Sequence, residues 1–523
     1  MSKEQVLGFV DFDEKIALEG SSLCQIAVSQ NLIDRLHRGK FVKISSLEGR
    51  EFLGRVIAGP FYKPEGMPAT SYITKTFIVR GETFENPPPY YAVFAVEIIG
   101  EISRGQLTST YTRPRPQSPV YSIPVLEVQE IIGSRGDMVI GHLLGYKGVK
   151  ILLDSQNMNI LPRNVGIFGT VGSGKTNTAQ VLIEEALKGR WAVFVLDVEG
   201  EYIYMDAPND DDYLAKVLES VYGLEPEGVG KLEVYVPIGR RSARSGAKKF
   251  SIFFEDVNPY VFAEIIGATE AQQRYLSRIV DRLKESRRSV EGEELEDLVI
   301  GSEIPPLTLR EVREEIEDNI GRVERFMRSS LMALATKLER LERLHIFDTG
   351  EQMPVKKLME PGSLTVVDLS DVEDRVKNIV IAWLLDRVFN LKIRGIKTKT
   401  MIVIEEAHTF VSLEAREKMA ATLDMLKVIA RRGRKRWLSL VFVSQQPGHL
   451  PAEIFELCNT RIIHALKSEI NINAVRRTTG GLTREHVSLI PALSTGEAFF
   501  VTPTYKFPLI IRVRPAKTMK RRF

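Results

Sequence analysis

The sequence predicts an α/β protein: a small N-terminal β-barrel, then an open parallel sheet flanked by helices and interrupted by a helical insertion. Three observations lead to this fold class. Residues 1–125 hold short β-rich runs with no helical periodicity. From about residue 138, strand patterns alternate with helix patterns. A complete G-x-x-x-x-G-K-[ST] motif at 169–176 stands between a strand and a helix, which is the context of a true phosphate-binding loop.

The composition is that of an ordinary globular protein. A length of 523 residues with 44% hydrophobic and 27% charged side chains suggests two to four domains. The 71 basic and 68 acidic residues nearly cancel, so any nucleic-acid surface must be local. Two cysteines, Cys24 and Cys458, favour a reducing cytoplasm over a disulfide scaffold. Residues 1–5 lack a signal-peptide pattern, and no apolar run approaches the ~20 residues of a membrane span.

The first predicted domain, 1–125, is a small β-barrel. Its short strands are separated by turn-rich segments, which include the prolines at 87–89. A proline-rich stretch at 113–124 is a plausible linker to the next domain. The predicted strands are 6–10, 24–28, 41–44 and 91–99.

The remainder is predicted as a core in two parts, 126–250 and 346–523, around a charged helical insertion at 251–345. The acidic stretch 291–297 in the insertion is expected to be a solvated loop. Two late runs, 497–502 and 508–513, are expected to form an antiparallel edge. The other predicted strands are 165–169, 191–197, 364–368, 400–405, 438–444 and 461–466.

The phosphate-binding loop predicts a nucleotide with Mg²⁺. It follows the apolar run Val165–Phe168 and precedes a helix at 177–188 with one apolar stripe. Its glycines allow backbone N–H groups to converge on a polyphosphate at a helix N-terminus. Lys175 is expected to reach the outer phosphates, and Thr176 to ligate Mg²⁺.

Polar residues at three other strand ends complete the predicted site. Glu405 and Glu406 end one strand; we assign Glu405 to the magnesium shell and Glu406 to the catalytic base. Asp197 ends the strand after the loop helix, and it either faces the ligand crevice or caps the next turn. Gln445 is expected to sense the γ-phosphate or hold the attacking water.

A basic run follows a predicted helix, with five cations among residues 431–436. Such a run is commonly a solvated surface. Its position between two site-bearing strands, near the sheet edge, also suits an arginine finger for the nucleotide of a neighbouring subunit.

Other nucleotide machines fit less well. Residues 197–200 match the D-x-x-G of switch GTPases, but no N-K-x-D motif is present. Residues 405–408 suggest a DEAH-box helicase, which needs two cores in one chain, yet only 117 residues follow Glu406. No L-S-G-G-Q signature supports an ABC-type ATPase. With one core, the finger must come from a partner chain, as in a ring ATPase.

Several motifs together resemble the HerA branch of the HerA/FtsK ATPases. The resemblance spans essentially the whole chain and implies a HAS-type barrel before a RecA-like core. Two positions depart from the usual pattern: Glu405 stands where many P-loop enzymes have Asp, and Gln446 where arginine is common. The motifs lie at 169–178, 196–202, 404–410, 429–435, 443–447 and 457–463.

The resemblance implies an ATP- and Mg²⁺-dependent hexamer that threads duplex DNA through a central pore as a translocase or helicase. It assigns Asp197 to the catalytic set, Arg431 to the trans arginine finger, and Arg163 to a second interface arginine. The implied nucleotide-binding residues are Gly169, Thr170, Val171, Gly172, Ser173, Gly174, Lys175, Thr176 and Asn177.

The family implies an effector partner docked on the barrel. This is a NurA-type nuclease in end resection for recombinational repair, or another nuclease or NAD-consuming effector in phage defence. The alternatives are a nucleotide-gated scaffold that activates an effector without translocating, and a monomeric P-loop kinase. Residues 239–249, then 447–451, are candidate DNA-contacting loops or plain solvated loops, and 517–522 is a candidate brace for a neighbouring subunit.

Overall fold

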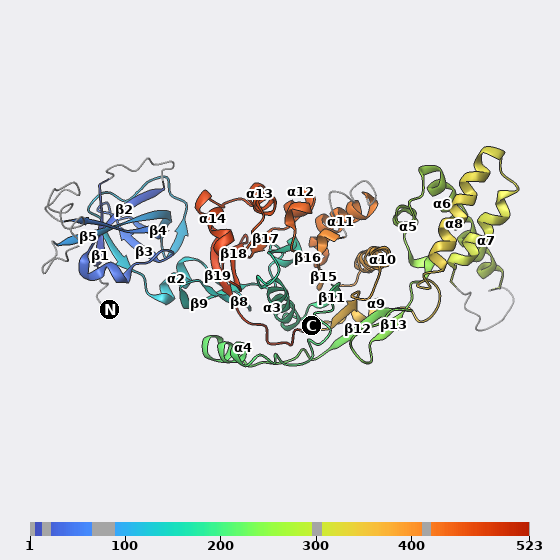
Figure 1. Ribbon diagram of the computed structural model, residues 1–523, viewed down its shortest axis with the longest axis horizontal. Helices are drawn as coiled ribbons and strands as arrows, with labels where there is room; N and C mark the ends of the chain where they lie inside the picture. Colours follow the sequence, from blue (N-terminus) through green and yellow to red (C-terminus); the bar gives the residue numbers. More distant parts are fainter. Residues whose placement is uncertain (1–5, 13–21, 65–88, 295–305, 410–419, 522–523) are drawn as a thin grey trace, which may run out of the picture. The chain divides into compact units, whose positions relative to one another are not determined.

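The computed structural model describes residues 6–12, 22–64, 89–294, 306–409 and 420–521 (Figure 1). Several predicted features lie outside these residues: the first five residues, two of the prolines at 87–89, part of the acidic stretch, Phe410 and Arg522. The chain forms two compact units. The first holds residues up to Arg135 with 141–152 and 504–512, and the second holds 136–140, 153–503 and the residues from Val513.

The first unit contains the predicted barrel. Its antiparallel strands follow the order β2-β1-β7-β3-β4-β5-β6, and the β2–β5 pairing closes the first six into a barrel. Alternate side chains such as Ile26, Phe94 and Val96 point inward and are fully buried. The strands are β1 Val6–Val10, β2 Leu23–Ser29, β3 Phe41–Ser45, β4 Glu51–Pro64, β5 Tyr90–Ser103, β6 Gln106–Thr108 and β7 Pro119–Ser122.

The domain boundary expected at residue 125 falls at a helix, α2 (Val125–Ile131), which belongs to the first unit. Three strands hold residues of both units: β8 Met138–Leu143, β9 Tyr146–Leu153 and β19 Leu509–Val513. The chain therefore passes between the units at these strands. The domain limits stay a prediction from the sequence.

The second unit is built on a parallel sheet. Its order is β13-β12-β14-β11-β15-β16-β10-β17, and β18 continues it antiparallel to β17. The central strands are buried along their whole length, as expected for a parallel sheet covered on both faces. The strands are β10 Val165–Phe168, β11 Ala192–Asp197, β12 Leu232–Pro237, β13 Lys248–Phe250, β14 Leu364–Asp368, β15 Thr400–Ile404, β16 Leu438–Ser444, β17 Thr460–Ile463 and β18 Glu497–Val501.

Helices flank the sheet of the second unit, and the predicted helical stretch follows β13. That stretch contains α5 Pro259–Ile265, α6 Glu270–Glu294, α7 Leu309–Ile320 and α8 Arg325–Glu342. Thr308 and Glu311 form a capping box that fixes the start of α7. The other helices are α3 Lys175–Lys188, α4 Asp212–Val217, α9 Val355–Leu358, α10 Asp374–Ile393, α11 Ala420–Arg432, α12 Ala452–Leu457, α13 Glu469–Thr478 and α14 Arg484–Leu489. No helix within the described ranges is long and apolar enough to span a membrane.

The C-terminal segment 513–521 packs along α3 of its own chain (Figure 1). Fully buried Arg514 lies 2.8 Å from a Glu184 oxygen and 2.9 Å from a Glu185 oxygen. The backbone N–H and hydroxyl of Thr518 also donate to Glu184. The described part of the segment thus follows a helix of its own chain, and a brace for a neighbouring subunit stays a prediction. Four charge-assisted contacts hold it there.

Because Arg514 neutralises two buried carboxylates, its loss should destabilise the second unit. We expect Arg514→Met to reduce the free energy of unfolding by about 3–5 kcal/mol, because Glu184 and Glu185 would lose their buried counter-charge. Thermal unfolding measures the change. Lys231→Ala, which removes an exposed 3.5 Å pair with Glu360, is the control and should cost less than about 1 kcal/mol. Equal melting temperatures for both variants would contradict the role of Arg514.

Candidate nucleotide site

The predicted site residues meet at one edge of the sheet. Strands β11, β15, β16 and β10 are neighbours in that order, and all run parallel. Their carboxyl ends are in register: Leu196 pairs with Ile404, and Phe168 pairs with Ser444. The residues that follow each strand therefore converge on the crevice where open α/β sheets bind ligands.

The loop 169–174 forms a tight turn before α3. Gly172 and Gly174 have φ of +73° and +110°, conformations that other residues rarely adopt. A Cβ at Gly169 would collide with the Ser173 hydroxyl, so the backbone could not turn so tightly with a larger residue. The first N–H groups of α3 have no intrahelical partner and carry the positive end of the helix dipole. The turn is suited to bind a polyphosphate.

Lys175 is held over this loop. Its Nζ donates to the carbonyl oxygen of Thr170 at 3.0 Å, and its side chain is buried. Burial lowers the pKa of Lys175, and the carboxylates of Glu406 and Glu201 act in the opposite direction. A carbonyl oxygen is a neutral partner, so a phosphate would be a stronger one for this ammonium group.

Thr176 contacts the carboxylate of Glu201, a residue that was not among the predicted site residues. Its hydroxyl donates to Oε2 of Glu201 at 2.6 Å. Oε1 of the same carboxylate lies 2.7 Å from Nζ of Lys520. The signal was present in the sequence, since Glu201 lies inside the motif at 196–202, but its spacing from Thr176 gave no reason to choose it.

Asp197 is a buried turn cap. Its carboxylate accepts backbone N–H groups from Gly200 at 2.7 Å, Glu201 at 3.0 Å and Tyr202 at 2.9 Å. Burial raises the pKa of Asp197 to about 6. Of the two interpretations left open by the sequence, these contacts match the cap of the following turn. Through this turn, Asp197 fixes the position of Glu201.

Glu405 faces the same turn. Its buried Oε2 accepts the N–H groups of Val198 at 3.2 Å and Glu199 at 3.4 Å. Burial raises the pKa of Glu405 well above its usual value, and the nearby Asp197 carboxylate adds to the effect. The two carboxyl groups interact, and burial raises the pKa of both. The structure therefore brings Glu201, and not the predicted Glu405, to the Thr176 hydroxyl.

Glu406 lies beside the residues expected to support a catalytic base. Its Oε1 accepts from Nε2 of Gln445 at 2.6 Å, and its Oε2 lies 3.1 Å from Nδ1 of His408. Burial alone would raise the pKa of Glu406, but its contacts with His408 and Gln445 outweigh burial and hold the pKa below its usual value. Its φ of +45° is a strained backbone, as found at functional sites. Glu406 is thus an ionised acceptor.

The two predicted interface arginines lie outside this cluster. Arg431 is exposed at the end of α11, and no hydrogen bond or ion pair links it to any described residue. Arg163 is half-buried in a short 3₁₀ turn, and its buried Nε finds no hydrogen-bond partner among the described residues. The neighbouring Arg434, in contrast, donates to Asn159 at 2.7 Å.

The side chain of Asn177, which was predicted to bind the nucleotide, instead contacts the C-terminal segment. The Asn177 side chain donates to the carbonyl of Arg514 and accepts the N–H of Ala516, both at 2.8 Å. Both polar atoms of its side chain are therefore engaged with the C-terminal segment. Val171 in the loop is exposed, so its side chain also has no role in shaping the turn.

The residues present fit a magnesium ion that arrives with a nucleotide. Thr176 offers a hard oxygen ligand at the start of α3, and Glu201 accepts a hydrogen bond from that hydroxyl. Within the described ranges, no group of three or more His, Cys, Asp or Glu side chains could hold a metal alone. Mg²⁺ commonly takes one or two protein ligands, with phosphate oxygens and waters completing its shell.

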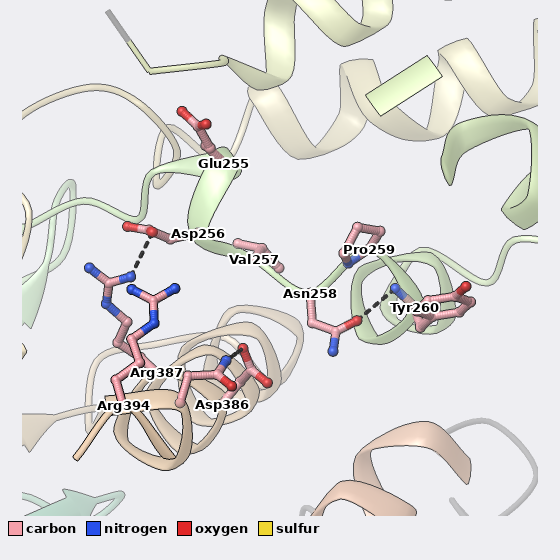
Figure 2. A pocket seen from close by; sticks show the side chains of 10 residues that line it. Glu255, Asp256, Val257, Asn258, Pro259, Tyr260, Asp386, Arg387 and Arg394 are labelled. Atoms are coloured by element: carbon pink, nitrogen blue, oxygen red, sulfur yellow. Dashed lines mark hydrogen bonds and ion pairs between the residues drawn. The ribbon is translucent and has the colours of Figure 1, made fainter. Parts of the chain in front are cut away.

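A polar pocket lies apart from this cluster (Figure 2). It is formed where α5 faces α10, and Arg387 lies 2.7 Å from Asp256 inside it. The Asn258 side chain is occupied as the N-cap of α5, and Asn390 donates to Asp386. None of the predicted site residues lines this pocket.

The candidate DNA loop 239–249 connects β12 to β13, two strands missing from the predicted set. Three of its cations are paired within the chain: Arg240 with Glu373, Arg244 with Asp206 and Lys248 with Glu233. Arg241 and Lys249 are exposed. Most of the charge that suggested a phosphate-binding loop is thus already neutralised.

Known proteins resemble this chain. A family model described as the central domain of helicase HerA matches residues 138–388. In this region the chain is similar to HerA proteins. The protein is an ATP hydrolase, and its cofactors are ATP and Mg²⁺.

HerA-named relatives align along most of the chain. The probable DNA double-strand break repair helicase HerA of Methanocaldococcus jannaschii is 24% identical over 92% of this chain and 92% of its own length. The DNA double-strand break repair helicase HerA of Sulfolobus acidocaldarius is 24% identical, over 84% of this chain and 81% of its own. Among solved structures, VirB4 of Thermoanaerobacter pseudethanolicus matches with a TM-score of 0.49 and 17% identity, over 73% of this chain and 97% of that one.

Proposed function

We propose that this ATPase is an ATP-driven translocase or helicase that acts on duplex DNA as a homo-hexameric ring. One observation carries the proposal: the chain assembles half of an ATPase site. Lys175, Thr176 and Glu406 converge within one subunit, whereas Arg431 is exposed and without a partner in the described ranges. A neighbouring subunit in a ring would supply the missing arginine. The HerA relatives, named as helicases of DNA repair, support the same activity.

The proposed chemistry assigns each residue a task. Backbone N–H groups of 172–176 bind the phosphates, and Lys175 neutralises their outer charge. Mg²⁺, when bound, would neutralise the charge that develops on the phosphate oxygens. Glu406 accepts a proton from the attacking water, and Gln445 holds the Glu406 carboxylate toward that water. In trans, Arg431 stabilises the transition-state charge and Arg163 supports the interface.

Asp197 and Glu405 act through the turn 198–202. Their five hydrogen bonds to backbone N–H groups fix this turn. The turn holds the Glu201 carboxylate against the Thr176 hydroxyl. In this proposal both residues position the magnesium site through the turn.

The partners follow from the family. DNA would pass through the ring pore, with exposed Arg241 and Lys249 and the loop 447–451 as candidate contacts. A NurA-type nuclease, or a defence nuclease or NADase, would dock on the barrel, where Phe9, Phe61 and Tyr62 are exposed. End resection in recombinational repair or phage defence, in the cytoplasm, are the proposed settings.

Mass in solution and DNA-stimulated ATP hydrolysis test this function together. We expect a hexamer in the presence of ATP and duplex DNA, and a hydrolysis rate that rises when DNA is added. Lys175→Ala is the control, which should abolish hydrolysis because the loop loses its only lysine. A stable monomer would overturn the ring. Hydrolysis that DNA does not change would instead support a nucleotide-gated scaffold for an effector.

A further inference from the structure

The C-terminal segment reaches the nucleotide site. After packing along α3, its described residues reach the turn that Asp197 caps. The N–H of Arg521 donates to the Glu201 carbonyl oxygen at 3.2 Å. The Lys520 ammonium group lies 2.7 Å from Oε1 of Glu201. Both residues therefore contact the turn that presents Glu201 to the loop.

Glu201 joins this segment to the hydroxyl that ligates Mg²⁺. Its Oε2 accepts from Thr176, and its Oε1 pairs with Lys520. The Glu201 side chain is 16% exposed, so the pair is shielded from solvent on the carboxylate side. The charge of Lys520 also acts to lower the pKa of Lys175, which puts both cations within electrostatic reach of one site.

The segment up to Met519 is firmly anchored. Thr518 is bound to Glu184, the Gln180 side chain donates to the Met519 carbonyl, and the Met519 N–H donates to Ala207. Lys520, in contrast, is 43% exposed. The Lys520 side chain can therefore leave Glu201 without disturbing the anchored residues before it.

A divalent ion bound at Thr176 would lie close to the Glu201 carboxylate, which already pairs with Lys520. When Thr176 offers an oxygen lone pair to Mg²⁺, its hydroxyl proton still needs an acceptor, and Glu201 is that acceptor. The ion then adds two positive charges close to Lys520, whose ammonium group is repelled. In the absence of the ion, the positive charge of Lys520 balances the negative charge of the Glu201 carboxylate.

We propose that Glu201 is a positioning residue of the magnesium site, and that Lys520 is a built-in cation that Mg²⁺–nucleotide must displace. The proposal rests on the nucleotide site proposed above at Lys175 and Thr176. It makes the end of the C-terminal segment a reporter of the nucleotide state, released when the metal is bound and docked when it is absent.

Binding of a fluorescent, non-hydrolysable ATP analogue, titrated with Mg²⁺, tests the proposal without turnover. We expect Lys520→Ala to lower the Mg²⁺ concentration for half-maximal binding by about two- to fivefold, since one competitor is removed. Glu201→Gln should raise it by about 10- to 100-fold, as for other residues that orient metal ligands. Lys517→Ala is the matched control: it lies in the same segment but pairs with Glu227 at 3.1 Å, and should change nothing.

The double variant Lys520→Ala/Glu201→Gln gives a further check. With Glu201 replaced, loss of Lys520 should have no added effect on the Mg²⁺ requirement. Hydrogen exchange gives a second readout: the Arg521 amide should exchange faster once Mg²⁺ and the analogue bind, while the Thr518 amide stays protected.

Two outcomes would overturn the proposal. One is an unchanged Mg²⁺ requirement in Lys520→Ala. The other is weaker analogue binding by Lys520→Ala, which would mean that Lys520 binds phosphate directly. If the proposed nucleotide site were wrong, the result would be different: the unaltered protein would bind no analogue at any Mg²⁺ concentration.

Discussion

Glu406→Gln should bind ATP almost as well as the unaltered protein and hydrolyse it about 10²- to 10⁴-fold more slowly. The substitution keeps the size of the side chain and an oxygen that can accept from Gln445. It removes the negative charge that takes the proton from water. The effect should therefore fall on kcat, with the dissociation constant for ATP changed by only a few-fold.

Single-turnover hydrolysis and equilibrium ATP binding separate these quantities. His408→Asn is a useful comparison, because His408 contacts the same carboxylate but is not itself a base in this scheme. We expect a smaller loss of kcat there, since Glu406 keeps its charge and its bond to Gln445. A Glu406→Gln protein that hydrolyses ATP at the normal rate would assign the base to another residue.

Arg431→Ala should reduce kcat by about 10³- to 10⁵-fold while leaving ATP binding nearly intact, because an arginine finger acts on transition-state charge. In the isolated chain Arg431 is exposed, and the described residues provide it with no partner. Arg434→Ala is the matched control. This arginine belongs to the same basic run but is bound to Asn159 in its own chain, so its loss should barely alter hydrolysis.

Mixing two inactive variants shows whether Arg431 acts across an interface. Arg431→Ala subunits keep an intact loop, and Lys175→Ala subunits keep an intact finger. In a randomly mixed ring, roughly a quarter of interfaces would join the intact loop to the intact finger, so activity should return in part. If Arg431 acted within its own chain, no interface would be complete and the mixture would stay inactive.

The strand pattern was sufficient to predict the core sheet, because its strands are fully buried and read as continuous apolar runs. β14 and β16 match their predicted bounds. Two strands that escaped prediction lie at one edge of this sheet: β12 is partly exposed at its start, and β13 has three residues, two of them lysines. An edge strand forms because it pairs with a neighbouring strand, and its own composition does not reveal which strand that is.

The site could be predicted only where a motif fixes local geometry. The loop 169–176 and the pair of Glu406 with Gln445 follow from strand ends that meet in a parallel sheet. The partner of Thr176 could not be predicted in this way. Glu201 reaches Thr176 only because Asp197 caps the turn that carries it. The contacts of Asn177 and Lys520 join positions more than 300 residues apart in the chain, which spacing cannot foresee.

The position of Arg521 has a practical consequence for how this protein is handled. A fluorescent label or crosslinker attached at Arg521 would lie against the turn that carries Glu201, because the Arg521 N–H donates to the Glu201 carbonyl oxygen. Its charge and bulk would then enter the measurement of every ATPase constant. Labels attached on the exposed face of the helical insertion, for example at Met332, would leave the hydrolytic centre undisturbed.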